Sequence, residues 1–206
     1  MTGGVAAGDR ERRIGLIQLV ALILLFAAPI VASWVMYLTG WTPSGRSNHG
    51  TLVSPVVPLP VVPLTDWNGE SVDLADRQGN WLMLLVMQPP CDQGCRDRLG
   101  AMARVHRALA RGRLHVDRAM VLLDPHPPAD ADDIRARWPD MRFLRADEGW
   151  WTQWDPVLRG ISGDGIAGRL YIVDPLGNLM MQYAPGQPAM EILEDLRHLL
   201  KVTQYH

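Results

Sequence analysis

The chain has 206 residues, of which 48% are hydrophobic and 20% charged, and its formal net charge is −2. This length suits one anchored domain, or at most two small ones. The nearly balanced charge gives no electrostatic basis for binding nucleic acid, so we expect no nucleic-acid partner.

The first predicted element is a membrane-spanning helix over residues 14–38, IGLIQLVALILLFAAPIVASWVMYL, which contains no charged residue. At about 1.5 Å per residue it is roughly 37 Å long, enough to cross a hydrocarbon core of about 30 Å. Trp34 and Tyr37 lie near its far end, where aromatic side chains favour the membrane interface. A cleaved signal peptide is the alternative, but its apolar core would be only about 7–15 residues long. We therefore expect an uncleaved anchor that binds the lipid bilayer.

Basic residues indicate the orientation of this helix. Arg10, Arg12 and Arg13 precede it, whereas only Arg46 follows it closely. The positive-inside rule then places residues 1–13 in the cytoplasm and the remainder of the chain outside. Nearly all basic residues are arginine, and Ala, Gly and Pro are frequent, which indicates a GC-rich bacterial source. The predicted location is a bacterial inner membrane, crossed once, with the C-terminal domain in the periplasm.

Residues 39–64 form the next segment, which is rich in Pro, Gly and Ser and shows neither helical nor strand periodicity. We interpret it as a semi-rigid, partly extended juxtamembrane spacer that lifts the following domain off the bilayer. The exported domain then covers residues 65–206.

Alternating strand and helix patterns follow the spacer. Residues 81–87, WLMLLVM, form a continuous apolar run between polar turns, which is typical of a fully buried central strand. Apolar spacing and turn residues predict the later elements in the same way. In chain order these are a helix over 96–111, a strand over 119–123, a short helix over 129–138, a brief strand over 142–144, a β-hairpin over 168–183 and a closing helix over 188–202.

The order of these elements predicts an α/β fold. Successive strand–helix–strand units give parallel neighbours and the hairpin adds antiparallel strands, so we expect a central mixed sheet flanked by helices. The two cysteines of the chain, Cys91 and Cys95, lie between the first buried strand and its helix. Thioredoxin-like folds carry their redox pair there, and sites in open α/β sheets gather at the carboxyl ends of strands. The prediction is a thioredoxin-like domain preceded by a single transmembrane helix.

Three kinds of chemistry are open to this Cys-x3-Cys pair. Cβ atoms at i and i+4 of one helix are about 5–6 Å apart, too far for a disulfide, so the pair can close only if Cys91 lies before the helix. A structural disulfide would add only about 2 kcal/mol of stability, because the closed loop is short. A redox-active dithiol would benefit from the helix N-terminus, which lowers thiol pKa values. Two thiolates with an imidazole would instead favour Cu(I).

Two further features of the sequence are an aspartate between the cysteines and a cluster of tryptophans. Asp92, between the cysteines, would raise the thiol pKa values or contact a partner. Trp150, Trp151 and Trp154 form an aromatic cluster. We expect this cluster to pack in the core or to cover the cysteine edge of the sheet, with an exposed partner site as the alternative.

Several motifs resemble those of the Sco/SenC family of cytochrome c oxidase assembly proteins. They are the N-terminal anchor, Cys-x3-Cys after the first core strand, VLLDPHPPAD at 121–130 and LYIVDPLGNLMMQYAPG at 170–186. The resemblance covers residues 60–200. It implies a copper chaperone, or a thiol–disulfide reductant, that prepares the copper centre of the oxidase. Its partner would be a cytochrome c oxidase subunit or another assembly factor.

The copper site of that family uses both cysteines and a histidine shortly before the late hairpin. By position the cysteines correspond to Cys91 and Cys95, but the place of the histidine falls near Ile166, and residues 159–175 contain no histidine. His126 follows the second buried strand, which should neighbour the first. The predicted metal ligands are therefore Cys91, Cys95 and His126, with Cu(I) as the candidate cofactor.

The sequence supports two hypotheses of function. In the first, the protein is a membrane-anchored thiol–disulfide or copper-handling factor that assists assembly of a haem–copper oxidase through Cys91 and Cys95. The missing family histidine favours redox work or transient Cu(I) binding within this hypothesis. In the second, the protein is a non-catalytic accessory subunit or scaffold of a respiratory oxidase complex, and the cysteines form a structural disulfide. The solvent accessibility of the cysteine pair discriminates between the two.

Overall fold

The computed structural model describes two compact units, Met1–Arg46 and Ser47–His206. The described residues are 5–39, 48–60, 62–74, 79–146, 148–163 and 165–203.

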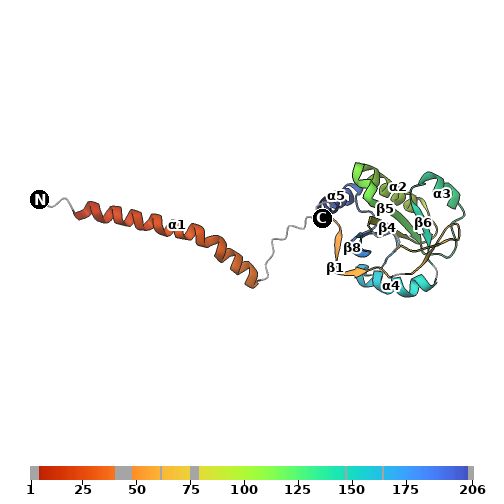
Figure 1. The fold of residues 1–206 in the computed structure, drawn as a ribbon, viewed down its shortest axis with the longest axis horizontal. Helices are drawn as coiled ribbons and strands as arrows, with labels where there is room; N and C mark the ends of the chain where they lie inside the picture. Colours follow the sequence, from red (N-terminus) through yellow and green to blue (C-terminus); the bar gives the residue numbers. More distant parts are fainter. Residues whose placement is uncertain are drawn as a thin grey trace. The chain divides into compact units, whose positions relative to one another are not determined.

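The first unit contains one helix, α1 (Val5–Thr39), which includes Pro29 in its interior (Figure 1). Its segment Gly15–Thr39 has 25 residues and a mean hydropathy of 2.5, and within the described residues it is the one helix long and apolar enough to cross a membrane. The predicted span, residues 14–38, lies within α1. A proline is tolerated in a membrane helix because neighbouring groups can satisfy the freed carbonyl. Residues 1–4 of the predicted cytoplasmic segment lie outside the described residues.

The second unit is built on one eight-stranded sheet in the order β1-β8-β7-β4-β5-β6-β2-β3. β4, β5 and β6 run parallel, and the other neighbouring pairs are antiparallel. This confirms the predicted mixed sheet and the late hairpin. The strands are β1 (Thr51–Pro58), β2 (Leu64–Asp66), β3 (Ser71–Val72), β4 (Trp81–Met87), β5 (Val116–Leu122), β6 (Arg142–Arg145), β7 (Leu170–Val173) and β8 (Asn178–Tyr183).

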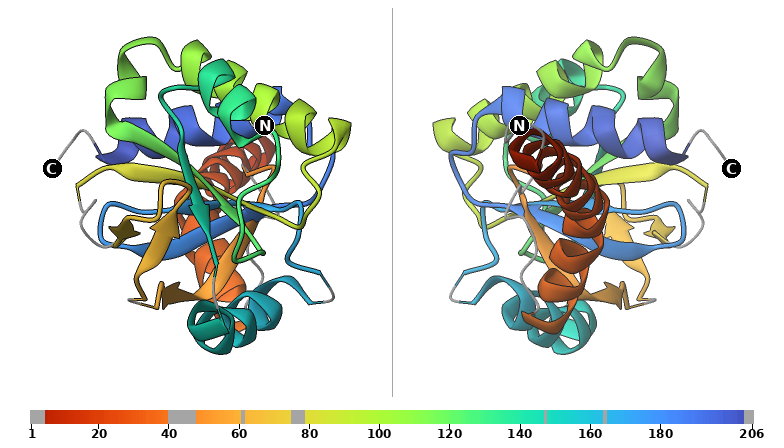
Figure 2. Two further views of the ribbon diagram at one scale, coloured as in Figure 1. Left: turned by 90° about the vertical axis from the view of Figure 1, so that its right-hand side faces the viewer. Right: turned by 90° about the vertical axis from the view of Figure 1, so that its left-hand side faces the viewer.

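Helices cover both faces of this sheet. Figures 1 and 2 show α2, α3 and α5 on one face and α4 on the other, in agreement with the two hydrophobic clusters of the domain. The predicted helices over 96–111, 129–138 and 188–202 correspond to α2, α3 and α5, and the sheet flanked by helices is confirmed. Their bounds are α2 (Gln93–Ala108), a 3-10 helix η2 (Ala110–His115), α3 (Ala131–Arg137), α4 (Glu148–Ser162) and α5 (Ala189–Thr203).

The central strand β4 divides the core into two layers. All seven of its residues are buried. Met83 and Leu85 face the cluster under α2 and α5, whereas Leu82 and Leu84 face the cluster under α4. A strand that is covered on both faces needs apolar residues at every position, which is why its sequence is a continuous apolar run.

The structure differs from the predicted spacer between residues 48 and 64. Residues 51–58 form β1, which pairs antiparallel with β8, and β2 begins at Leu64. β1 is an edge strand, where prolines such as Pro55 and Pro58 are tolerated because one side of the strand needs no partner. Because prolines are rare in strands, their frequency in this segment led to the prediction of a spacer instead of a strand. Residues 40–47 and 61 of the predicted spacer lie outside the described residues.

The second difference is α4, which the sequence patterns did not predict. The helix includes Pro156, and an interior proline normally ends or kinks a helix. Trp150 and Trp154 are fully buried and stack with ring centroids 4.9 Å apart. Both belong to the cluster on the face opposite the cysteines. Core packing is therefore confirmed for these two tryptophans, and the alternative of a cover over the cysteine edge is wrong.

Candidate functional site

The cysteines lie where β4 leads into α2. β4 ends at Met87, Cys91 lies in the connecting turn, and Cys95 lies in the first turn of the helix. The carboxylate of Asp92 caps this helix by accepting a hydrogen bond of 2.9 Å from the backbone N–H of Cys95. Aspartate is among the preferred residues at such a cap. The cap fixes the turn that carries Cys91 relative to the helix that carries Cys95, a role that the sequence analysis did not assign to Asp92.

Cys91 and Cys95 form a disulfide, with their Cα atoms 5.1 Å apart. This separation lies within the usual range of about 4.4–6.8 Å. As predicted, the bond closes because Cys91 precedes the helix instead of occupying one of its turns. On reduction, both sulfurs would lie at the N-terminus of α2, where the exposed backbone N–H groups stabilise thiolates.

Both cysteines are buried, but their surroundings differ. Cys95 is 0% exposed and packs into the core under α2. Cys91 is 5% exposed and borders an open depression of about 700 Å³ at the carboxyl ends of β4 and β5. Pro89, Pro90 and Asp124 form part of its wall. An incoming thiolate would therefore meet Cys91 first, and Cys95 is the sulfur that would leave.

An ion pair closes one side of this depression. The guanidinium of Arg96, in the first turn of α2, pairs with the carboxylate of Asp130, which precedes α3. Both residues line the depression together with Cys91. The pair holds the beginning of α3 beside the beginning of α2, so the wall is built from two elements that the sequence analysis treated separately.

His126 also lines this depression, in the loop after β5. Its side chain is 83% exposed, and its Nδ1 lies 3.4 Å from an Asp124 carboxylate oxygen, which also accepts a hydrogen bond from the backbone N–H of His126. Within the described part of the chain, no three His, Cys, Asp or Glu side chains cluster closely enough to hold a metal ion. In the disulfide form both sulfurs are bonded to each other, so this donor set does not fit copper and we derive no step through it.

The position of the missing family histidine is apolar here. Ile166 is buried in the cluster under α4. Two residues later, Gly168 has a φ of +75°, and a Cβ atom at this position would overlap the guanidinium of Arg98. Arg98 reaches from α2 to this loop and also approaches the sulfur of Met87, 3.7 Å away. The close approach of Arg98 to Gly168 joins α2 to the segment before β7, a contact that no sequence signal marked.

Comparison with known proteins identifies the domain. Residues 81–203 match the family described as the transmembrane-like, thioredoxin-like, C-terminal domain. The chain belongs to this family. The predicted thioredoxin-like fold is thereby confirmed, and the disulfide joins the turn after the central strand of that domain to the first turn of the following helix. No curated protein matches the chain significantly.

Solved structures of Sco proteins resemble the domain in fold. The apo Sco1 protein of Thermus thermophilus has a TM-score of 0.59 and 18% identity, with 76% of this chain and 99% of that chain covered. Copper-bound yeast Sco1 has a TM-score of 0.58 and 14% identity, with coverages of 72% and 95%. BsSco, described through its disulfide switch as a member of the Sco family of cytochrome c oxidase assembly proteins, has a TM-score of 0.53 and 16% identity, with coverages of 72% and 96%. The predicted resemblance to Sco/SenC proteins is confirmed at the level of fold.

Proposed function

We propose that the protein is a membrane-anchored thiol–disulfide exchange factor that acts through Cys91 and Cys95. The observation that carries this proposal is the asymmetry in the surroundings of the disulfide. Both cysteines are buried, but Cys91 lines an open depression, whereas Cys95 packs into the core at the start of α2. A purely structural disulfide needs no depression beside it. It would also contribute little here, because a short closed loop adds only about 2 kcal/mol.

The exchange reaction begins from the reduced pair. The Cys91 thiolate attacks one sulfur of a partner disulfide, whose S–S bond breaks and whose other sulfur leaves as a thiolate. The Cys95 thiolate then attacks Cys91 Sγ, which forms the Cys91–Cys95 bond and releases the second partner sulfur as a thiolate. Two electrons pass from the pair to the partner. A second dithiol protein restores the pair by the reverse steps.

The partner we propose is a cytochrome c oxidase subunit or one of its assembly factors. The support is the fold shared with BsSco, which is named as a member of a family of cytochrome c oxidase assembly proteins. The proposed location is a bacterial inner membrane, with the domain in the periplasm. The apolar helix Gly15–Thr39 and the arginines before it support this orientation. An oxidising exterior would keep the pair closed until a dedicated reductant acts.

Cu(I) binding by the reduced pair is a second candidate, which agrees with the copper-bound yeast Sco1 structure of similar fold. Reduction would release two thiolates, and His126 lies on the wall of the depression that Cys91 borders. An anaerobic titration of the reduced full chain against a competing Cu(I) chelator tests it. Tight one-to-one binding that His126→Ala weakens supports a copper site, whereas negligible binding leaves redox exchange as the function.

Cysteine variants test the main proposal in cells that depend on this chain for oxidase activity. The Cys91→Ser/Cys95→Ser variant should abolish copper loading of the oxidase while the protein stays at normal levels in the membrane. Cys95→Ser should accumulate a mixed disulfide with its partner through Cys91, and Cys91→Ser should not. Unchanged oxidase activity in the double variant would overturn the proposal and favour a scaffold with a structural disulfide.

A further inference from the structure

A second concave surface lies between α2 and α3, on the helical face of the sheet. It is a groove of about 370 Å³ whose walls come from one face of α2 and from the C-terminal end of α3. Four arginines and one aspartate provide its charge, so the lining carries a net charge of 4 − 1 = +3. These residues are Arg96, Arg104, Arg107, Arg137 and Asp97. The whole chain has a formal net charge of −2, so this concentration of positive charge is local.

The partners of these side chains leave much of the positive charge uncompensated. Arg96 pairs with Asp130, and Asp97 accepts a hydrogen bond of 2.8 Å from the side chain of Gln93. Arg104 and Arg107 are exposed and form no ion pair with any residue that the structure describes. The guanidinium groups of Arg104 and Arg107 are therefore exposed without a paired carboxylate among the described residues.

The fourth arginine of this groove, Arg137, is contributed by α3. The guanidinium of Arg137 lies over the ring of Trp138, 5.5 Å from its centroid. Trp138 is half-buried and packs against the core cluster under α2. The ring thus holds this arginine in place and adds an apolar wall to a polar groove. A ligand in the groove would meet both fixed positive charge and a flat apolar surface.

A buried arginine on the neighbouring strand β5 adds to the positive charge near Arg107. Arg118, on β5, is 6% exposed, and its Nε has no hydrogen-bond partner among the described residues. Its one ion pair there is with Asp140, at 3.8 Å. Burial lowers the pKa of Arg118, Asp140 opposes this shift, and the positive charge of Arg107 lowers the pKa further. An anion bound beside Arg107 would relieve this repulsion between like charges.

We propose that this groove, lined by Arg96, Arg104, Arg107 and Arg137, binds an acidic segment of a partner protein. Guanidinium groups in a row along a helix face suit a series of carboxylates, which they can bind through paired hydrogen bonds. A flat bilayer does not enter a concave groove as an extended peptide can. The net negative charge of the chain gives no support for a nucleic acid.

The groove adjoins the candidate redox site. Arg96 lines both the groove and the depression that Cys91 borders, so a peptide in the groove would continue toward Cys91. This placement of the partner's reactive group rests on the proposed function. The binding of the acidic segment does not rest on it, because no sulfur atom lines the groove.

Peptide binding to the full chain in nanodiscs of phosphatidylcholine tests this proposal. The probe is a fluorescein-labelled peptide of repeating Asp-Glu-Gly, followed by fluorescence anisotropy, with a Lys-Lys-Gly repeat for comparison. We expect the acidic peptide alone to bind, with an affinity that falls as salt is added. In Arg104→Glu/Arg107→Glu the affinity should fall roughly tenfold or more, because two attractive contacts become repulsive.

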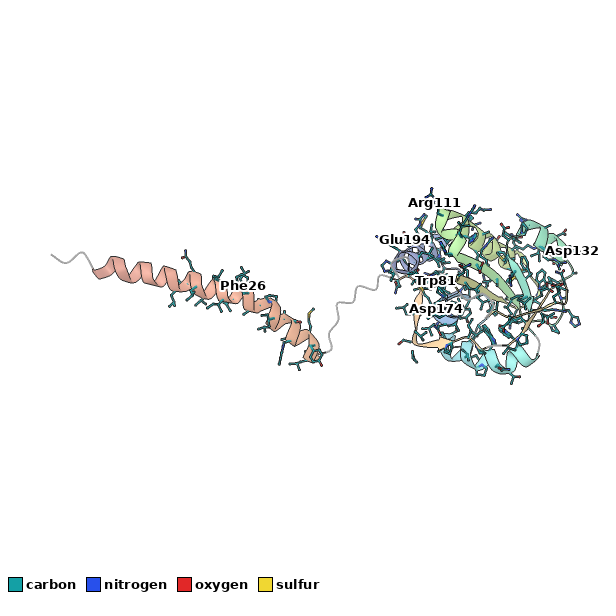
Figure 3. The ribbon with its side chains drawn as sticks, viewed as in Figure 1. Phe26, Trp81, Arg111, Asp132, Asp174 and Glu194 are labelled. Carbon is teal, nitrogen blue, oxygen red and sulfur yellow. A yellow bond between two sulfur atoms is a disulfide. The ribbon has the colours of Figure 1, made fainter. Side chains whose placement is uncertain are left out.

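Arg111→Glu paired with Arg113→Glu is the matched control, since it makes the same change in net charge at exposed arginines of η2 outside the groove. Figure 3 shows Arg111 on the outer surface of the domain. Circular dichroism of both variants verifies the fold. Equal losses in the two variants, or no peptide binding at all, would overturn the proposal. Binding of anionic phosphatidylglycerol vesicles without binding of the peptide would also overturn it, in favour of a lipid surface. The reduction potential of Cys91–Cys95 tests the proposed function independently of this titration.

Discussion

The hydroxyl of Tyr183 donates a hydrogen bond of 2.9 Å to the carboxylate of Asp195 in the core between β8 and α5. This carboxylate is 1% exposed. It also accepts hydrogen bonds from the backbone N–H groups of His49, at 3.0 Å, and Gly50, at 2.8 Å. One buried carboxylate thus joins the residues before β1 to the last helix of the domain.

Replacing this carboxylate should destabilise the domain strongly. Asp195→Ala removes the carboxylate acceptor of the buried Tyr183 hydroxyl, which keeps only the Met181 sulfur as a neighbouring acceptor, and of two partly buried backbone N–H groups. We therefore expect a loss of roughly 1–3 kcal/mol in the free energy of unfolding. Urea unfolding of the full chain in detergent, followed by tryptophan fluorescence, measures it. The control is Glu194→Ala, because Glu194 is largely exposed and contacts only the His49 ring among the described groups (Figure 3). Equal losses in the two variants would contradict this account of Asp195.

The same pair predicts a loss of stability at alkaline pH. Burial, with the nearby Asp195 charge, raises the pKa of Tyr183 well above its usual value of 10.0. The folded state therefore keeps the phenol proton after the unfolded state has released it. Its contribution is complete below about pH 10 and declines at higher pH, by up to about 1.4 kcal/mol per pH unit. Tyr183→Phe should flatten the decline in urea-unfolding free energy between pH 9 and 11, and an unchanged slope would exclude this cause.

The backbone conformation of Gly168 predicts a third effect. Gly168→Ala adds a Cβ atom to a backbone with a φ of +75°, which is strained for any L side chain, and the flexible Arg98 side chain must also move aside. We expect a loss of roughly 1–3 kcal/mol in unfolding free energy. Gly160→Ala is the control, because Gly160 lies in α4 with open space around it and alanine favours a helix. A loss at Gly160 as large as that at Gly168 would show that the positive φ of Gly168 is not the cause.

The N-cap of α2 predicts a change in redox equilibrium. Asp92→Asn keeps an oxygen that can accept the hydrogen bond from Cys95 but removes a negative charge beside the sulfurs. The reduced, thiolate form should then gain stability, and the reduction potential should rise by up to about 30 mV. Equilibration with glutathione, followed by thiol trapping, measures the shift. Asp97→Asn, one turn further along the helix, should change the potential less. A fall in the potential of Asp92→Asn would contradict the electrostatic argument.

The elements predicted most accurately from the sequence are those determined by local features, such as a strand that is buried along its whole length or a turn held by its own side chain. β4 is buried on both faces, so every residue of 81–87 is apolar and its bounds agree with the structure. The hairpin around Asp174 agrees because Asp174 accepts hydrogen bonds from the backbone N–H groups of Leu176 and Asn178, a typical turn interaction. The position of Cys91 before the helix followed from the geometry required of a disulfide.

The elements that are stabilised by segments far away in the chain were not predicted from the sequence. β1 contains prolines that only an edge strand accommodates, and its edge position depends on pairing with β8, far along the chain. α4 combines Pro156 with tryptophans that pack under the sheet, and no helical signal in sequence outweighed that proline. The arginine groove joins α2 to α3, which are separated in the chain by β5. A local sequence pattern does not indicate which helices pack side by side, so the groove could not be predicted.

The reduction potential of Cys91–Cys95 in the full chain tests the central claim most directly. The protein would be equilibrated with defined glutathione or dithiothreitol buffers in phosphatidylcholine nanodiscs, and the reduced fraction read by alkylation and mass spectrometry. A working exchange pair should have a potential above about −300 mV, and Cys91 should be alkylated before Cys95 as the bond opens. A potential below about −300 mV, with both cysteines inaccessible until the domain unfolds, would identify a structural disulfide and contradict the proposed function.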